Sequence, residues 1–149
     1  MHRLKNEAAF QRHLRASLGY TFFQKCKFFK THGNEYTEKG VSDLVGHIHG
    51  NFIAIECKMW KGRPTTEQLA FCRGMLKTGA MGIFAIYRYE DGVHTVHWCP
   101  ADMAFSYRMQ MIWPVSRLVS VDRDPLNPDG RKIEMFDCKQ LLPLLEMNK

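Results

Sequence analysis

Two short runs rich in β-branched residues constrain the fold most strongly, because a tight turn separates them. The runs are residues 43–49 and 52–58, and the turn signal between them is Gly50-Asn51. This arrangement predicts a β-hairpin in which Asp43 lies opposite Lys58.

The predicted hairpin brings two carboxylates to one point. Glu56 and Lys58 lie on the same face of their strand because side chains alternate, and a slip of one or two residues still leaves Asp43 beside them. Opposed side chains on neighbouring strands lie within roughly 8 Å, so Asp43 and Glu56 can hold one cation between them. Lys58 offsets only one of the two charges, and Mg²⁺ suits such oxygen ligands. The alternative is a surface hairpin with a salt bridge between Asp43 and Lys58.

The rest of the chain alternates helical and strand patterns. The expected elements are a helix over 5–18 that ends at Gly19, strands over 20–29, 43–49 and 52–58, a helix after Thr65, strands over 82–89 and 93–98, and a helix over 102–111. A polar loop over 30–42 could close over a substrate. Because a crossover helix joins parallel strands, the 82–89 strand is expected to pair in parallel with the hairpin sheet. The order is α-β-β-β-α-β.

Two polar residues on the predicted helices have both structural and functional explanations. Glu7 falls on the inward face of the first helix, where a carboxylate is costly unless it is paired or serves a metal, although an acid in the first turn also favours the helix dipole. Gln68 completes a capping box with Thr65, and the same helix N-terminus suits a phosphate.

Composition indicates one basic domain. The chain has 149 residues and a net charge of +6, which favours polyanionic partners. Much of the positive charge lies in the first fifth of the sequence, although a solvated helix face would look the same.

The five cysteines are odd in number and lack C-x-x-C spacing, so they are expected to be free thiols in a reducing compartment. The polar N-terminus and the lack of an 18-residue apolar run lead us to expect a cytoplasmic protein.

Several of these residues together resemble a known nuclease superfamily. The run Gly40-Val41-Ser42-Asp43-Leu44, the run 52–58 (FIAIECK) and Gln68 on the following helix resemble the PD-(D/E)XK nucleases. Within that superfamily the chain is most similar to the virus-type replication-repair nuclease (VRR-NUC) branch and the Holliday-junction resolvases. The resemblance covers about residues 5–98, and Ser42 stands where the family usually has proline.

The resemblance implies a fold and a set of site residues. The fold would be α/β, a restriction-endonuclease-like αβββαβ core with a mixed central sheet flanked by helices. Residues 1–112 would form this core, and residues 113–149 would form a C-terminal extension packed on the same domain. The site roles implied are metal binding by Asp43, Glu56 and the backbone carbonyl of Cys57, water activation by Lys58, support of the metal or of a second ion by Glu7, and contact with Lys58 or the scissile phosphate by Gln68.

The expected activity is a Mg²⁺-dependent DNA endonuclease, with Mn²⁺ able to substitute, that is selective for branched or structured DNA. The residues expected to contact DNA are basic side chains near the site and near the N-terminus: Lys61, Arg63, Arg12, Arg15, Lys25, Lys27 and Lys30. Two alternatives are a restriction-type or repair nuclease whose partner supplies specificity, and a catalytically inactive nucleic-acid-binding protein with the same fold.

Cleavage of a four-way junction needs two active sites, so a homodimer is also expected. Its candidate interface is formed by the apolar segments Met109 to Val121 and Leu141 to Met147. A turn-rich segment over 122–131 is expected to set off the C-terminal extension. The small size of the chain is compatible with a phage origin.

Overall fold

The computed structural model describes residues 1–31, 40, 42–101 and 113–147. Its elements are α1 (Glu7–Thr21), β1 (Cys26–Lys30), β2 (Leu44–Ile48), β3 (Asn51–Met59), α2 (Thr66–Lys77), β4 (Met81–Glu90), β5 (Val93–Pro100), β6 (Val115–Asp122), β7 (Lys132–Phe136), the 3₁₀ helix η2 (Cys138–Leu141) and α3 (Leu142–Met147). The expected α-β-β-β-α-β order is confirmed from α1 to β4. The predicted helix over 102–111 and most of the 30–42 loop lie outside the described residues.

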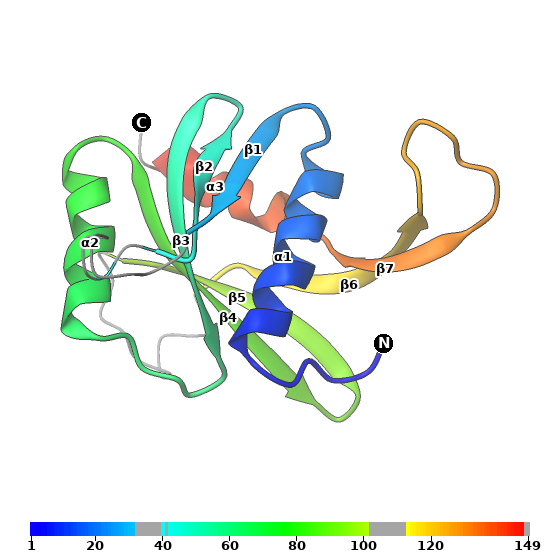
Figure 1. Cartoon of the computed structure of the whole chain (residues 1–149), viewed down its shortest axis with the longest axis horizontal. Helices are drawn as coiled ribbons and strands as arrows, with labels where there is room; N and C mark the ends of the chain where they lie inside the picture. The colour runs from blue at the N-terminus through cyan, green and yellow to red at the C-terminus, as the bar shows by residue number, and fades with distance from the viewer. Residues whose placement is uncertain (32–39, 41, 102–112, 148–149) are drawn as a thin grey trace.

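The strands form one mixed sheet in the order of the sequence, β1 to β7 (Figure 1). The pairing of β3 with β4 is parallel, as predicted, and the other neighbouring strands are antiparallel. The fold class is therefore α/β with a mixed central sheet. In the part of the chain that is described, no helix is long and apolar enough to cross a membrane.

Helices cover the two faces of the sheet. Phe10, Leu14 and Leu18 of α1 belong to a large core with the inward residues of β2 and β3. On the other face, α2 packs over β3 and β4 and contributes Cys72 to a smaller core. Figure 1 shows α1 and α2 on opposite sides of β3. Strand β3 is therefore buried from both sides.

The hairpin is formed one residue earlier than predicted. The turn consists of His49 and Gly50, which adopt φ values of +51° and +81°, and Ile48 pairs with Asn51. Positive φ at both central residues suits a type I′ turn, whose twist matches the flanking strands. This correction shifts the pairing by two residues, so Asp43 comes opposite Glu56 instead of Lys58.

The first helix and first strand differ from their predicted bounds. The helix begins after the N-cap Asn6, whose side chain accepts a hydrogen bond from Ala9 N, and it continues through Gly19 to Thr21. Tertiary contacts hold this last turn: the Thr21 hydroxyl donates to Phe136 O at 3.4 Å, and Phe22 is buried just beyond it. The predicted strand over 20–29 was therefore wrong in its first half.

The C-terminal segment completes the sheet and the core. Strand β6 pairs with β5, and the turn-rich segment over 122–131 connects β6 with β7 instead of acting as a linker. Leu141, Leu144 and Leu145 are buried in the core of the same chain. Burial within the same chain explains why these residues are apolar. Their apolar character is therefore no reason to place a dimer interface there, as we had expected from the sequence. Residues 109–112 of the other candidate segment lie outside the described residues.

We expect Gly82→Ala to destabilise the fold, because a Cβ at Gly82 would lie 2.1 Å from the backbone oxygen of Cys72 in α2. The helix backbone would have to move, and overpacking of this kind costs about 1–3 kcal/mol. Gly74→Ala is the matched control, since a Cβ there meets nothing within 4 Å and alanine favours a helix by about 0.5–1 kcal/mol. Chemical denaturation should give opposite signs for the two variants. Equal stability would contradict the close packing of α2 on β4.

Candidate functional site

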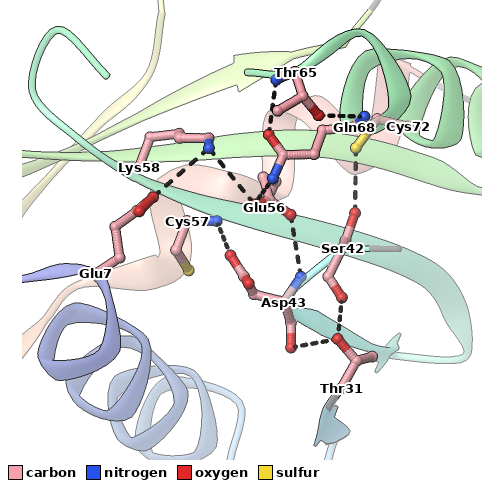
Figure 2. Close-up of polar contacts among 10 residues, drawn as sticks. All are labelled: Glu7, Thr31, Ser42, Asp43, Glu56, Cys57, Lys58, Thr65, Gln68 and Cys72. Atoms are coloured by element: carbon pink, nitrogen blue, oxygen red, sulfur yellow. Dashed lines mark hydrogen bonds and ion pairs between the residues drawn. The ribbon is translucent and has the colours of Figure 1, made fainter. Parts of the chain in front are cut away.

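Two carboxylates meet at the open end of the β2–β3 hairpin (Figure 2). Asp43 immediately precedes β2, and Glu56 lies on β3 with an exposed fraction of only 3%. Asp43 Oδ2 accepts a hydrogen bond from Cys57 N at 2.9 Å, and Asp43 N donates to Glu56 Oε2 at 3.3 Å. The backbone of each strand thus holds the acid of the other.

Lys58, two residues after Glu56 on β3, adds a positive charge to the site and contacts α1. Its Nζ lies 3.9 Å from Glu56 Oε1 and 3.7 Å from Glu7 Oε1. The Glu7 side chain is 43% exposed. It lies at the border of the buried face of α1, which includes Phe10, Leu14 and Leu18. Glu7 is therefore near the site as predicted, but it is an ion-pair partner of Lys58 at the solvent edge and not a fully inward side chain.

Gln68 serves the helix cap and the site at once. Its Oε1 accepts from Thr65 N at 2.9 Å, which completes the predicted capping box. Its Nε2 donates to Glu56 Oε1 at 2.8 Å. The resemblance implied a contact with Lys58 or with the substrate, whereas the structure gives a contact with Glu56. The two ends of one amide thereby connect the start of α2 to the buried acid.

Sequence reasoning missed the residues that fix the backbone in front of Asp43. Ser42 Oγ lies 3.3 Å from Cys72 Sγ in α2, and the Thr31 hydroxyl donates to Ser42 O at 2.7 Å. Thr31 N also donates to Asp43 O at 2.9 Å. In the family pattern Ser42 is only a departure from proline. A small polar residue before the aspartate was the available signal, because a hydroxyl can bind neighbouring elements that proline cannot.

The backbone of Cys57 contributes to the site, whereas its side chain belongs to the core. Its backbone N–H binds Asp43, while its thiol is fully buried in the core under α1. Burial raises the pKa of this thiol well above its usual range, so the side chain is an inert apolar group. The role of its carbonyl as a metal ligand stays a prediction. All five cysteines are free, as expected.

The predicted DNA-binding residues are spread around the site. Lys61 and Arg63 are exposed in the loop after β3. Arg12, Lys25 and Lys27 are exposed on α1, on the following turn and on β1, and Lys30 is half-buried at the end of β1. Arg15 differs from the others because its Nη2 donates to Phe28 O at 3.1 Å.

Comparisons with known proteins give a likeness of overall shape. No family model matches this chain, and no curated protein sequence matches it. The structure is similar to that of Hjc, a Holliday junction resolvase of Archaeoglobus fulgidus, with a TM-score of 0.46 and 14% sequence identity over 93% of this chain and 99% of that one. The roles of the residues in this chain therefore rest on their own contacts.

The surroundings of Glu56 disfavour its ionised form. Burial, followed by the charge of Asp43, raises the pKa of Glu56 to about 8, against the opposite effect of Lys58. Two facing acids with one ammonium leave a negative charge uncompensated. A divalent, oxygen-preferring cation would supply the missing charge, so this donor set fits Mg²⁺.

The site offers a Mg²⁺ ion two acidic side chains, those of Asp43 and Glu56. Among the described residues, no group of three or more histidine, cysteine, aspartate or glutamate side chains could hold a metal ion. Glu7 is thus not a third acid of the Asp43 and Glu56 pair. An ion at this pair would complete its shell with backbone oxygen, water or substrate, as Mg²⁺ commonly does.

The raised pKa of Glu56 predicts how the metal-free protein responds to pH. Between the unfolded pKa of about 4.3 and the folded pKa of about 8, the unfolded chain has lost a proton that the folded protein retains. Stability therefore falls as pH rises through this window, by up to about 5 kcal/mol, and levels off above it.

Glu56→Gln should remove this dependence and stabilise the metal-free protein at pH 8.5. Urea denaturation of both proteins in EDTA at pH 5 and pH 8.5 measures the difference, and the other titrating groups are common to both. Parallel pH dependences would show that Glu56 titrates normally.

Proposed function

We propose that this protein is a Mg²⁺-dependent phosphodiesterase that cuts DNA at the Asp43, Glu56 and Lys58 site. The observation that carries the proposal is the buried Glu56 carboxylate facing Asp43, with the ammonium of Lys58 3.9 Å from Glu56. Such an arrangement is costly for folding alone, and perturbed acids of this kind concentrate at functional sites.

Asp43 and Glu56 would hold the ion, and the Cys57 carbonyl is adjacent in the chain. A bound divalent ion lowers the pKa of its water and polarises a phosphoryl oxygen. The chain's own part is to fix the geometry. The hydrogen bond from Cys57 N fixes one Asp43 oxygen, and the Gln68 amide fixes one Glu56 oxygen. The second Glu56 oxygen accepts from Asp43 N, which keeps the two acids together.

Lys58 would orient the attacking water and stabilise negative charge on the phosphate. Its Nζ lies 3.7 and 3.9 Å from its two acidic neighbours, which is longer than a direct charge-assisted hydrogen bond of about 2.7–2.9 Å. The two acids therefore centre the ammonium without engaging its N–H groups closely. Those N–H groups can donate to a phosphate oxygen or to water.

DNA is the proposed substrate because the chain is basic and its exposed basic residues lie on elements next to the site. The net charge is +6, and exposed lysines and arginines occur on β1 and in the loop after β3. Contacts of this kind bind backbone phosphates without sequence preference. Within this proposal we expect a preference for branched or otherwise structured DNA.

Substitutions at the site test the catalytic assignment. We expect Asp43→Asn and Lys58→Met each to lower Mg²⁺-dependent cleavage of a DNA substrate by about 10²-fold or more, because metal binding and charge stabilisation are lost. Lys77→Met is the matched control, since Lys77 is exposed in the last turn of α2, and it should retain full activity.

A thermal shift gives a readout that is independent of cleavage. Mn²⁺ or Mg²⁺ should raise the unfolding temperature of the wild-type protein, because a ligand that binds only the folded state stabilises it, and Asp43→Asn should abolish the rise. Full cleavage by Asp43→Asn and Lys58→Met would refute the site. If the wild-type protein binds DNA but never cleaves it with either metal, it is a binding protein.

A panel of labelled DNAs tests the substrate. Linear duplex, nicked, flapped and four-way-junction DNAs are incubated with the protein and Mg²⁺ at equal concentration. We expect the branched substrates to be cut about tenfold faster or more than the linear duplex. Symmetric cuts across the junction would identify a resolvase, and equal cutting of every duplex would exclude structure selectivity.

A further inference from the structure

Two large aromatic side chains are exposed on one face of the sheet next to the candidate site. Phe29 on β1 is 59% exposed and Phe52 on β3 is 65% exposed. Phe29 pairs with Val45 of β2, and Phe52 pairs with His47 of the same strand. Directly paired residues point to the same face, and side chains two positions apart do so as well. Both rings therefore lie on the face that carries Asp43 and Glu56.

Among the residues that the structure describes, no helix covers this part of the face. The opposite face of β1, β2 and β3 is buried under α1 through residues such as Phe28, Leu44 and Ile53. On the near face, α2 packs over β3 and β4, and Figure 1 shows β1 and β2 farther from α2 than β3 is. We call the open area formed by Lys27, Phe29, Val45, His47 and Phe52 the aromatic face.

The aromatic face carries positive charge. Lys27 Nζ lies 5.7 Å from the centroid of the Phe29 ring, and the exposed Lys25 lies just before the same strand. The residues of β1 and β2 include no acidic side chain. Exposed aromatic rings among cations are a surface that suits stacked bases with a phosphate backbone. A neutral apolar partner would gain nothing from the lysines.

The aromatic face is continuous with the site. Asp43 lies two residues before Val45, and Phe29 is the residue beside Val45 on β1. With strands about 4.8 Å apart and a rise of about 3.4 Å per residue, the Cα atoms of Phe29 and Asp43 are roughly 8 Å apart. Phe29 is therefore within reach of a DNA strand whose phosphate lies at Asp43 and Glu56.

We propose that the aromatic face binds unpaired bases of the DNA strand next to the scissile phosphate, with the Phe29 and Phe52 rings as stacking platforms. Bases inside a duplex are already stacked on each other, so only unpaired bases offer a free face to a protein ring. The inference rests on the proposed function, because it assigns these bases to the strand that the site cuts. It gives that function a substrate class: DNA with unpaired nucleotides at the point of cleavage.

Binding without metal tests this proposal separately from cleavage. The affinity for a fluorescent oligo(dT) strand is measured by anisotropy in EDTA for the wild-type protein, Phe29→Ala and Phe52→Ala. We expect each substitution to raise Kd about fivefold or more, the factor that corresponds to about 1 kcal/mol of stacking per base. Phe23→Ala is the matched control, because Phe23 is 39% exposed but lies in the turn before β1, at the end of β1 remote from Asp43. It should change Kd less than twofold.

Two further variants separate stacking from apolar burial and from charge. Phe29→Trp should keep the affinity, and the fluorescence of its new indole should be quenched by oligo(dT), whereas Phe29→Leu should bind as weakly as Phe29→Ala. Lys27→Ala should reduce the slope of log K against log salt by roughly 0.7, the value for one phosphate contact on a single strand.

The outcomes distinguish this proposal from the proposed function. Unchanged Kd in the Phe29→Ala Phe52→Ala double variant would overturn base stacking, even if the wild-type protein cleaves DNA. Lost binding in that variant together with no cleavage by the wild-type protein would support the aromatic face and reject the nuclease. If sedimentation shows a wild-type dimer that the double variant loses while Kd is unchanged, a second copy covers the face and the proposal is wrong.

Discussion

Two acidic side chains face each other across the β2–β3 hairpin, and the surrounding contacts compensate for that repulsion. Asp43 and Glu56 are held by backbone N–H groups of the opposite strand, which lowers the cost of burying them. Burial and the neighbouring charge nevertheless raise the pKa of Glu56. The pair is thus electrostatically incomplete in the protein alone.

Helices α1 and α2 each contribute a polar contact to this pair or to its lysine. At the start of α2, Gln68 donates to Glu56, and at the start of α1, Glu7 pairs with Lys58. The apolar residues of the same helices pack against opposite faces of the sheet. The packing of the two cores therefore determines where the polar groups meet. A shift of either helix would move a site residue together with the core residues of that helix.

The two helices cover the sheet unequally, and this places the site at a border. The α1 side is buried from β1 to β3, whereas α2 covers the other side at β3 and β4. Asp43 and Glu56 lie where the covered part of that face ends and the open aromatic face begins. At this border a buried carboxylate lies next to an exposed surface that an extended ligand can use. Trp60, which directly follows β3, is not part of the aromatic face: Arg88 lies 4.3 Å from its ring centroid, and the His97 ring lies 5.2 Å away.

The sequence by itself determined the order of the elements and the identity of the residues at the hairpin. The strand signal of 52–58 and the Thr65 and Gln68 capping box are local, and both elements are present in the structure. Local signals did not determine the ends of α1, because Gly19 is compatible with either a stop or a continuation. Contacts of Thr21 with the distant β7 extend the helix. Strands β6 and β7 also depend on pairing with elements far from them in the chain.

Only the tertiary structure decided which residues of the hairpin oppose each other. A shift of two residues leaves every side chain on the same face, so the apolar pattern is satisfied equally by a turn at His49-Gly50 and by one at Gly50-Asn51. Pairing of β2 with β1 and of β3 with β4 holds both strands and selects the first register. That choice turned a predicted contact between Asp43 and Lys58 into a direct opposition of Asp43 and Glu56. It left Lys58 to pair with Glu7, because α1 packs beside β3 and a residue more than fifty positions away in sequence becomes its neighbour.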